Sequence, residues 1–209
     1  LLDVDGRISE VGSLAEVRRG NEQVRVVDFG DAILLPSLVN AHTHLELTDY
    51  PRWAGQSGEF STPDNFVDWI LQVIQVKHTV PHENYLPSLA HGIVLSLAAG
   101  TGAVGDIVSH LHARKAYHDC PLRGQIYLEA LGHSPDFIRK SLQAIEEALE
   151  DKQIGMMKLG VSPHSPYTIS GEYLAQLYEK CANEALHCST HVAESVDEVD
   201  FLQCHDGDI

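Results

Sequence analysis

His42 and His44, two positions apart at the end of an apolar run, are the residues of this sequence best suited to metal chemistry. Side chains alternate between the faces of a strand, so both imidazoles would project from one face at the end of a strand predicted over residues 34–41. Two imidazoles held side by side supply half of a four-coordinate metal site. The alternative is a strand that carries two partly exposed histidines and no ligand.

A third candidate ligand, His191, stands at the end of the last strand that the sequence predicts. Catalytic zinc sites typically use three protein ligands, and His191 would complete the set. Glu194 follows three residues later and places a carboxylate just past that strand. The alternatives are a hydrogen-bonded core histidine at 191 and, at 194, an acid favoured by a helix dipole.

The elements that must position these residues alternate along the chain. Strands are predicted over residues 34–41, 103–108, 123–131, 156–162 and 187–193, and helices over 65–78, 82–99, 135–150, 170–185 and from Ser195 onward. Strands and helices in this alternation indicate parallel βαβ units. Residues 50–63 are rich in Pro, Gly and Ser and are predicted to form a loop. Asp64 would cap the next helix, and loop and helix together would form a lid over the site. Trp69 of this helix would line the pocket or, alternatively, pack in the core.

The third predicted strand shows which way the faces point. Ile126, Leu128 and Ala130 would meet the helices, while Glu129 and its polar neighbours face the other way. A doubly wound sheet has helices on both faces and would need both to be apolar. One polar face therefore favours the interior of a (β/α)8 TIM-type barrel, which needs about 250 residues. Only about five of the eight units fit in this chain of 209 residues.

Three motifs, in this order along the chain, resemble the amidohydrolase superfamily. They are LPSLVNAHTH at residues 35–44, GVSPHSPYT at 160–168 and THVAES at 190–195. The closest likeness is to the cytosine deaminase-like branch, which includes chlorohydrolases and purine-type deaminases; Ser37 departs from it, because the family usually has Gly there. The resemblance implies that residues 34–209 are the N-terminal part of a metal-dependent hydrolase barrel. Residues 1–33, with a turn at Asp5-Gly6 and a strand predicted over 24–29, would then be the remnant of a small β-sandwich.

The resemblance also implies a single divalent metal ion, zinc first and iron as an alternative, bound by His42, His44 and His191. Lys158 lies too deep in its strand to bridge a second metal, as a carboxylated lysine does in binuclear members. Such a metal lowers the pKa of its water to about 7, and the resulting hydroxide would attack a ring carbon that bears an amino group. By the same resemblance Glu194 would shuttle the proton and help ammonia to leave.

Three further side chains are candidate substrate contacts. By resemblance His164, in the Pro-His-Ser-Pro-Tyr turn, would hydrogen-bond substrate; the alternative is a histidine that stabilises the turn. Glu46 follows His44 as HTHLE, which is similar to aminofutalosine-type deaminases and favours a nucleoside-like substrate. Glu129 is the third candidate because it lies on the polar face of its strand, which would face the interior of the barrel.

The most favoured activity is an aminohydrolase that releases ammonia from a purine-like or nucleoside N-heterocycle. The alternatives are a triazine-type chlorohydrolase or other C–N hydrolase, and an inactive fragment with a non-catalytic role. In the family a histidine of the sixth strand and an aspartate of the eighth complete the site. Neither strand is predicted here, and both chain ends look cut, so we assign the activity to a parent protein and expect the fragment to be inactive.

Charge and hydropathy argue against nucleic acid and a membrane as partners, and the expected partner is a small-molecule substrate. A formal net charge of −16 argues against a nucleic-acid surface. No apolar run approaches the roughly 20 residues of a membrane span, and no signal peptide opens the chain. The four cysteines lack CxxC spacing, which favours a reduced, cytoplasmic protein. An open strand edge would favour a homo-oligomer that covers it.

Overall fold

A computed structural model describes residues 1–58, 62–151 and 153–205. The chain divides into two compact units, Leu1–Pro36 and Ser37–Ile209. The second unit holds the sheet and all the candidate site residues. Within the described residues, no helix is both long and apolar enough to cross a bilayer.

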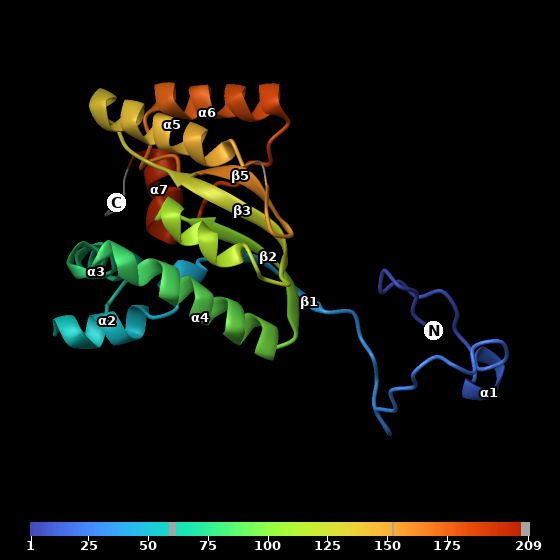
Figure 1. The fold of residues 1–209 in the computed structure, drawn as a ribbon. Coiled ribbons are helices and arrows are strands. Elements are labelled where there is room, and N and C mark those ends of the chain that lie inside the picture. Colours follow the sequence, from blue (N-terminus) through green and yellow to red (C-terminus); the bar gives the residue numbers. More distant parts are fainter. Residues whose placement is uncertain (59–61, 152, 206–209) are drawn as a thin grey trace. The chain divides into compact units, whose positions relative to one another are not determined.

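Among the described residues, the sheet of the second unit has five strands in the order β1-β2-β3-β5-β4 (Figure 1). β1 (Leu38–Thr43), β2 (Thr101–Val108), β3 (Arg123–Ala130) and β5 (Met157–Pro163) pair in parallel. The two-residue β4 (Gln153–Ile154), which the sequence did not predict, pairs with β5 in antiparallel fashion. The parallel order means that β1, β2, β3 and β5 all end at the same edge of the sheet, where residues from different strands can meet.

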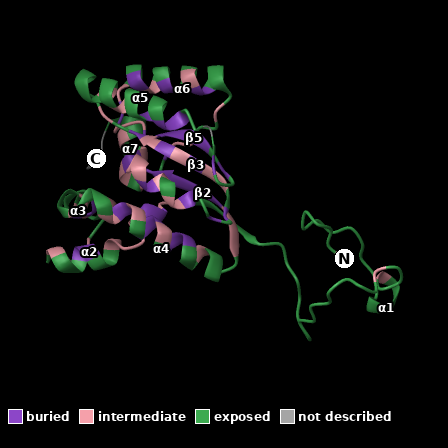
Figure 2. Ribbon diagram, in the orientation of Figure 1, coloured by how far each residue is buried: buried purple, intermediate pink, exposed green. Residues whose placement is uncertain are grey.

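Helices cover one face of this sheet. α4 (Tyr85–Ala98) contacts β2, α5 (Pro135–Leu149) contacts β3 and α6 (Gly171–Glu184) contacts β5. Figure 2 shows buried residues, in purple, on the strands and on the helix sides that meet them. The other helices described in this unit are α2 (Tyr50–Ser57), α3 (Phe66–Thr79), α7 (Val196–Cys204) and the short 3-10 helices η1 (Leu45–Leu47), η2 (His82–Asn84) and η3 (Leu111–Tyr117).

The alternation predicted for β3 is confirmed. Ile126, Leu128 and Ala130 are fully buried against the helix layer, whereas Tyr127 and Glu129 on the other face are only half-buried. Together with the helix–strand alternation, this supports the barrel prediction: the sheet and its helices are part of a (β/α) barrel, not of a doubly wound sheet.

Two predictions about the ends of the sheet were wrong. The first strand was predicted over residues 34–41, but β1 begins at Leu38 and ends at Thr43, so His42 belongs to the strand and His44 follows it. The predicted strand over 187–193 forms only one bridge, between Val161 and Cys188, although the backbone N–H of His191 also donates to the His164 carbonyl at 2.8 Å. This segment therefore follows the edge of β5 through isolated backbone hydrogen bonds and does not form a ladder, and no described strand pairs with its other side.

The predicted loop at 50–63 was wrong at its start, because residues 50–57 form α2. Pro51 stands in the first turn of that helix, where a missing N–H costs nothing, and Gly58 ends it in the left-handed conformation at φ 75°. The remainder of the loop includes residues 59–61, which lie outside the described part. Asn65, not Asp64, caps α3, and its side chain accepts the N–H of Asp68.

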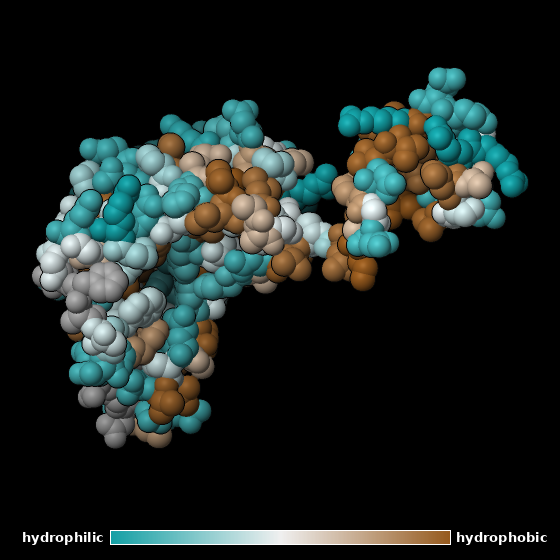
Figure 3. Space-filling model, turned by 90° about the horizontal axis from the view of Figure 1, so that it is seen from below, coloured by the Kyte–Doolittle hydropathy of each residue, from teal (hydrophilic) through white to brown (hydrophobic). Residues whose placement is uncertain are grey.

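The first unit contains little regular structure. Ser13 and Glu16 form a capping box on the four-residue α1 (Leu14–Val17), and a single bridge joins Leu2 to Ile8 around the turn at Gly6. The strand predicted over 24–29 was wrong, because no described segment pairs with it. Its apolar side chains stay exposed, and Figure 3 shows many brown, hydrophobic side chains on this unit. Its origin as part of a β-sandwich remains a prediction.

Candidate metal and substrate site

Three histidines converge where β1 and β5 end. The ring centroids lie 5.3 Å apart for His42 and His44, 5.0 Å for His42 and His191, and 5.4 Å for His44 and His191. One ring nitrogen of each lies within 4.8 Å of the others. Residues 147 positions apart in the sequence therefore face one point, as their places at strand ends predict.

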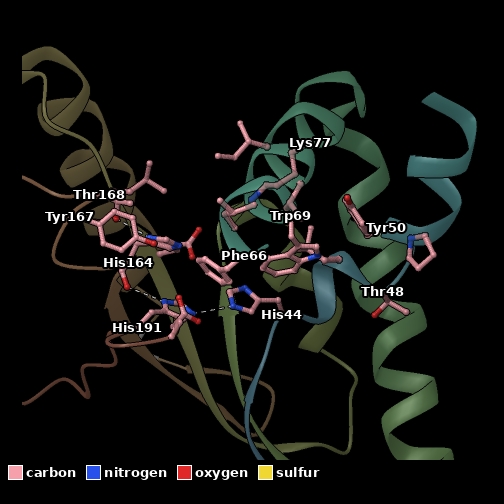
Figure 4. Close-up of a pocket in the computed structure, with 18 residues that line it drawn as sticks. His44, Thr48, Tyr50, Phe66, Trp69, Lys77, His164, Tyr167, Thr168 and His191 are labelled. Atoms are coloured by element: carbon pink, nitrogen blue, oxygen red, sulfur yellow. Dashed lines mark hydrogen bonds between the residues drawn. The ribbon is translucent and has the colours of Figure 1, made fainter. Parts of the chain in front are cut away.

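His191 is held so that one nitrogen is free to bind a metal. Its Nδ1 lies 2.9 Å from the backbone carbonyl of His164, and because a carbonyl only accepts, Nδ1 donates. The neutral ring then carries its lone pair on Nε2. That Nε2 lies 3.3 Å from Nε2 of His44, the contact drawn as a dashed line in Figure 4.

This spacing fits a zinc ion. Two nitrogens bound tetrahedrally at 2.0–2.1 Å would stand about 3.3 Å apart. A ligating imidazole must be neutral. Burial, followed by the neighbouring rings of His191 and His42, lowers the pKa of His44 to about 4. Burial and His191 also lower the pKa of His42, an effect that the carboxylate of Glu194 opposes.

Asp106, a buried residue of β2, holds the turn that carries His44. It was not identified from the sequence as a residue of the site. The N–H of Leu45 donates to Asp106 Oδ1 at 2.8 Å, and the Tyr117 hydroxyl donates to Oδ2 at 2.9 Å. Burial raises the pKa of Asp106 to about 8, against the two hydrogen bonds, which lower it. An acid inside the apolar run AVGDIV was the available signal, because a charge is buried only where it has partners.

A second group lies beside the histidines. A carboxylate oxygen of Glu129 and one nitrogen each of His164 and His191 lie within 4.8 Å of one another. Burial raises the pKa of Glu129 to about 7, which the charge on Lys77 opposes. Burial lowers the pKa of His164 to about 4, and its Nδ1 lies 2.8 Å from Thr168 Oγ1. The other ring nitrogen of His164 is thus available to a ligand.

A cavity of about 550 Å³ joins these groups to an apolar wall (Figure 4). Its polar end includes His44, His164, His191, Glu129 and Glu194. The opposite wall comes mainly from α3, with side chains at one helical face: Phe66, Trp69, Ile70, Val73 and Ile74. Of the two positions predicted for Trp69, the structure shows the one at the cavity, where the side chain is 43% exposed and is not packed in the core.

Lys77 brings a positive charge to the same cavity from the end of α3. Its Nζ donates to Ser109 Oγ at 2.9 Å. From the sequence, Lys77 is only one residue of the helix predicted over 65–78, because nothing local shows that its side chain reaches the loop after β2.

Glu46 does not lie where a substrate contact was expected. The side chain is fully buried, and its two oxygens accept the backbone N–H groups of Ser109 at 3.1 Å and His110 at 3.0 Å, together with the Ser109 hydroxyl. Burial alone would raise its pKa, but the hydrogen bonds from His110 and Ser109 and the charge on Lys77 outweigh it and lower the pKa to about 2. Glu46 therefore joins the loops after β1 and β2, and it is not among the residues that line the cavity.

The profile of the amidohydrolase family matches residues 33–209. Adenosine deaminase of Helicobacter pylori is 26% identical over 200 residues, covering 95% of this chain and 47% of that protein. Aminodeoxyfutalosine deaminase of Deinococcus radiodurans is 31% identical over 183 residues, covering 84% of this chain and 40% of that protein.

A solved structure shows the same fold. The crystal structure of Helicobacter pylori aminofutalosine deaminase in complex with methylthio-coformycin superimposes with a TM-score of 0.79 at 23% identity. The match covers 95% of this chain and 47% of that one. The chain spans about half the length of the curated relatives it matches.

Proposed function

The chain belongs to the amidohydrolase family, and from this we propose that the protein is a metal-dependent aminohydrolase that releases ammonia from an adenosine-like nucleoside. The observation that carries the proposal is the convergence of His42, His44 and His191, with two Nε2 atoms at 3.3 Å. The relatives named above as deaminases of adenosine and of aminodeoxyfutalosine support the reaction and the substrate class.

We propose that these three histidines hold one divalent cation. Neutral imidazoles suit zinc, and iron is the alternative, because nitrogen ligands accept several first-row metals. When bound, such a cation supplies Lewis acidity and brings the pKa of water close to 7. The side chains around it supply the rest of the chemistry.

Glu194 is the proposed proton carrier. It borders the polar end of the cavity, beside the histidines. Its carboxylate would take a proton from water, pass it to a ring nitrogen of the substrate and assist departure of the amino group as ammonia. Water thus supplies the oxygen that replaces the amino nitrogen, and no oxidant or reductant is needed.

The remaining groups would bind and orient the substrate. His164 offers one ring nitrogen to the heterocycle, and Glu129, whose pKa burial raises to about 7, can hydrogen-bond it from β3. Phe66 and Trp69 offer aromatic surface to the part of the nucleoside that lies away from the reacting carbon. An apolar wall of this extent suits a nucleoside better than a small free base.

We further propose a cytoplasmic protein that acts on a small molecule, with no nucleic-acid partner. The net charge of −16 supports the last point, and the cysteine spacing supports the first. A homo-oligomer that covers the edge beyond residues 187–193 is also proposed.

Ammonia release by the full-length protein tests the proposal. The substrates are adenosine, adenosines substituted at the 5′ position, cytosine and a chlorotriazine. We expect ammonia from the adenosines, and none after treatment with a chelator until zinc is restored. Ammonia from cytosine alone, or chloride from the triazine alone, would place the protein elsewhere in the family. Glu179→Gln, an exposed change on α6, is the control and should leave the rate unaltered.

A further inference from the structure

Glu198, in the first turn of α7, is a fully buried acid, and full burial is unusual for a glutamate. Its Oε2 accepts the backbone N–H of Glu194 at 2.8 Å. Its Oε1 is buried without a hydrogen-bond partner among the described residues. The side chain is thus desolvated, and its one hydrogen bond goes to the backbone of the proposed proton carrier.

The backbone beside Glu194 needs such support. Ala193 has a φ of 60°, in the left-handed region that residues other than glycine rarely adopt. Conformations of this kind persist only where the surroundings hold them, and they concentrate at functional sites. The strained residue turns the chain from the segment of His191 to the start of α7.

The hydrogen bond differs from ordinary helix capping. Ser195 is the N-cap of α7, and its Oγ accepts the N–H of Glu198 at 3.1 Å. In a capping box the acid would reach back to the N–H of the capping serine. Here it reaches one residue further, to Glu194, so the bond holds the residue that lies outside the helix.

We propose that Glu198 is a positioning residue for Glu194. By holding the N–H of Glu194 against the strain at Ala193, it fixes the direction in which the Glu194 carboxylate leaves the backbone. The inference rests on the proposed function in so far as Glu194 carries the proton. A proton carrier must lie within hydrogen-bond reach of its target, and a shift of about 1 Å can cost about 100-fold in rate.

Kinetics of the full-length protein test this role. Glu198→Ala should lower kcat by about 10- to 100-fold and leave KM within about twofold, because placement of the carrier and not substrate binding is lost. Glu198→Gln keeps an oxygen acceptor and should stay within about threefold of the wild type. Glu198→Asp keeps the charge but is too short to reach Glu194, so it should behave like the alanine variant, and it decides the matter if the alanine variant does not fold.

Asp200→Ala, an exposed change on the same helix, is the matched control and should leave kcat unaltered. A residue that only caps the helix would lower thermal stability and leave kcat of the folded enzyme unchanged. That outcome for Glu198→Ala and Glu198→Asp would overturn the proposal.

Hydrogen exchange at the Glu194 amide separates this inference from the proposed function. If the wild type releases no ammonia from any substrate, the proposed function fails, and the amide alone then decides whether Glu198 holds Glu194. We expect exchange at least about 10-fold faster in Glu198→Ala than in the wild type and in Asp200→Ala. Equal rates in all three would overturn the inference whatever the activity.

Discussion

Replacing Glu46 with glutamine should destabilise the protein by about 3 kcal/mol at neutral pH. A pKa lowered from 4.5 to about 2 corresponds to that free energy, at 1.36 kcal/mol per pKa unit. The hydrogen bonds give a similar value. Glutamine has one acceptor oxygen, so its amide would face a backbone N–H of Ser109 or His110, and a buried donor without an acceptor costs about 1–3 kcal/mol. Loss of the charge that Lys77 balances adds to this.

Chemical and thermal denaturation of the wild type and Glu46→Gln measure the effect. For a chain of this size, 3 kcal/mol corresponds to a fall in Tm of about 6–12 °C. The folded pKa of Glu46 is depressed, so its contribution is present above the unfolded value near 4.5 and is lost as pH falls toward 2. The gap between the two proteins should therefore close between about pH 5 and pH 2. Glu179→Gln, which changes an exposed acid, should shift stability by less than about 0.5 kcal/mol. A Glu46→Gln protein as stable as this control at pH 7 would refute the claim that the Glu46 carboxylate stabilises the protein by joining the loops after β1 and β2.

Three further changes have defined outcomes. Glu194→Gln keeps the shape but cannot take a proton, so turnover should fall about 10²- to 10⁴-fold with metal content unchanged; near-normal turnover would show that Glu194 is not the proton carrier. Gly160→Ala would place a Cβ 2.5 Å from the His187 carbonyl oxygen and so push the segment of His191 away from β5. The free energy of unfolding, measured by denaturation, should fall by about 1–3 kcal/mol, and zinc binding, measured by titration, should weaken. Unchanged zinc affinity would show that the position of this segment does not affect the metal site. Tyr117→Phe leaves a buried oxygen of Asp106 without its donor and should lower the free energy of unfolding by about 1–3 kcal/mol in the same denaturation assay; no loss would mean that Asp106 does not need this partner.

Local sequence signals were sufficient to predict those elements whose structure is set by neighbouring residues and by one buried face. The alternation in β3 and the helix predicted from residue 170 both agree with the structure, in which Ser170 caps α6, because side-chain period and capping are set within a few residues. The same reasoning brought His42, His44 and His191 to one end of the sheet. Parallel strands place their C-terminal ends together, so only the order of strands along the chain was needed.

The errors arose where the decisive partner is far away in sequence. The Glu46 carboxylate accepts the backbone N–H groups of Ser109 and His110, which lie 63 and 64 positions later in the sequence. No local pattern reveals these hydrogen bonds. The segment over 187–193 has the composition of a strand, but a strand needs neighbours, and the described chain offers it only β5. In α2 a proline suggested a loop, although a first-turn proline is compatible with a helix.

The most direct test of the account is the position of a bound metal. Crystals of the full-length protein with zinc, measured on both sides of the zinc absorption edge, would locate the ion by its anomalous scattering. We expect one peak at roughly 2.0–2.1 Å from a ring nitrogen of each of His42, His44 and His191. A peak held instead by Glu129, His164 and His191, the other cluster that could take a cation, would contradict the assignment, as would no peak at any of these histidines.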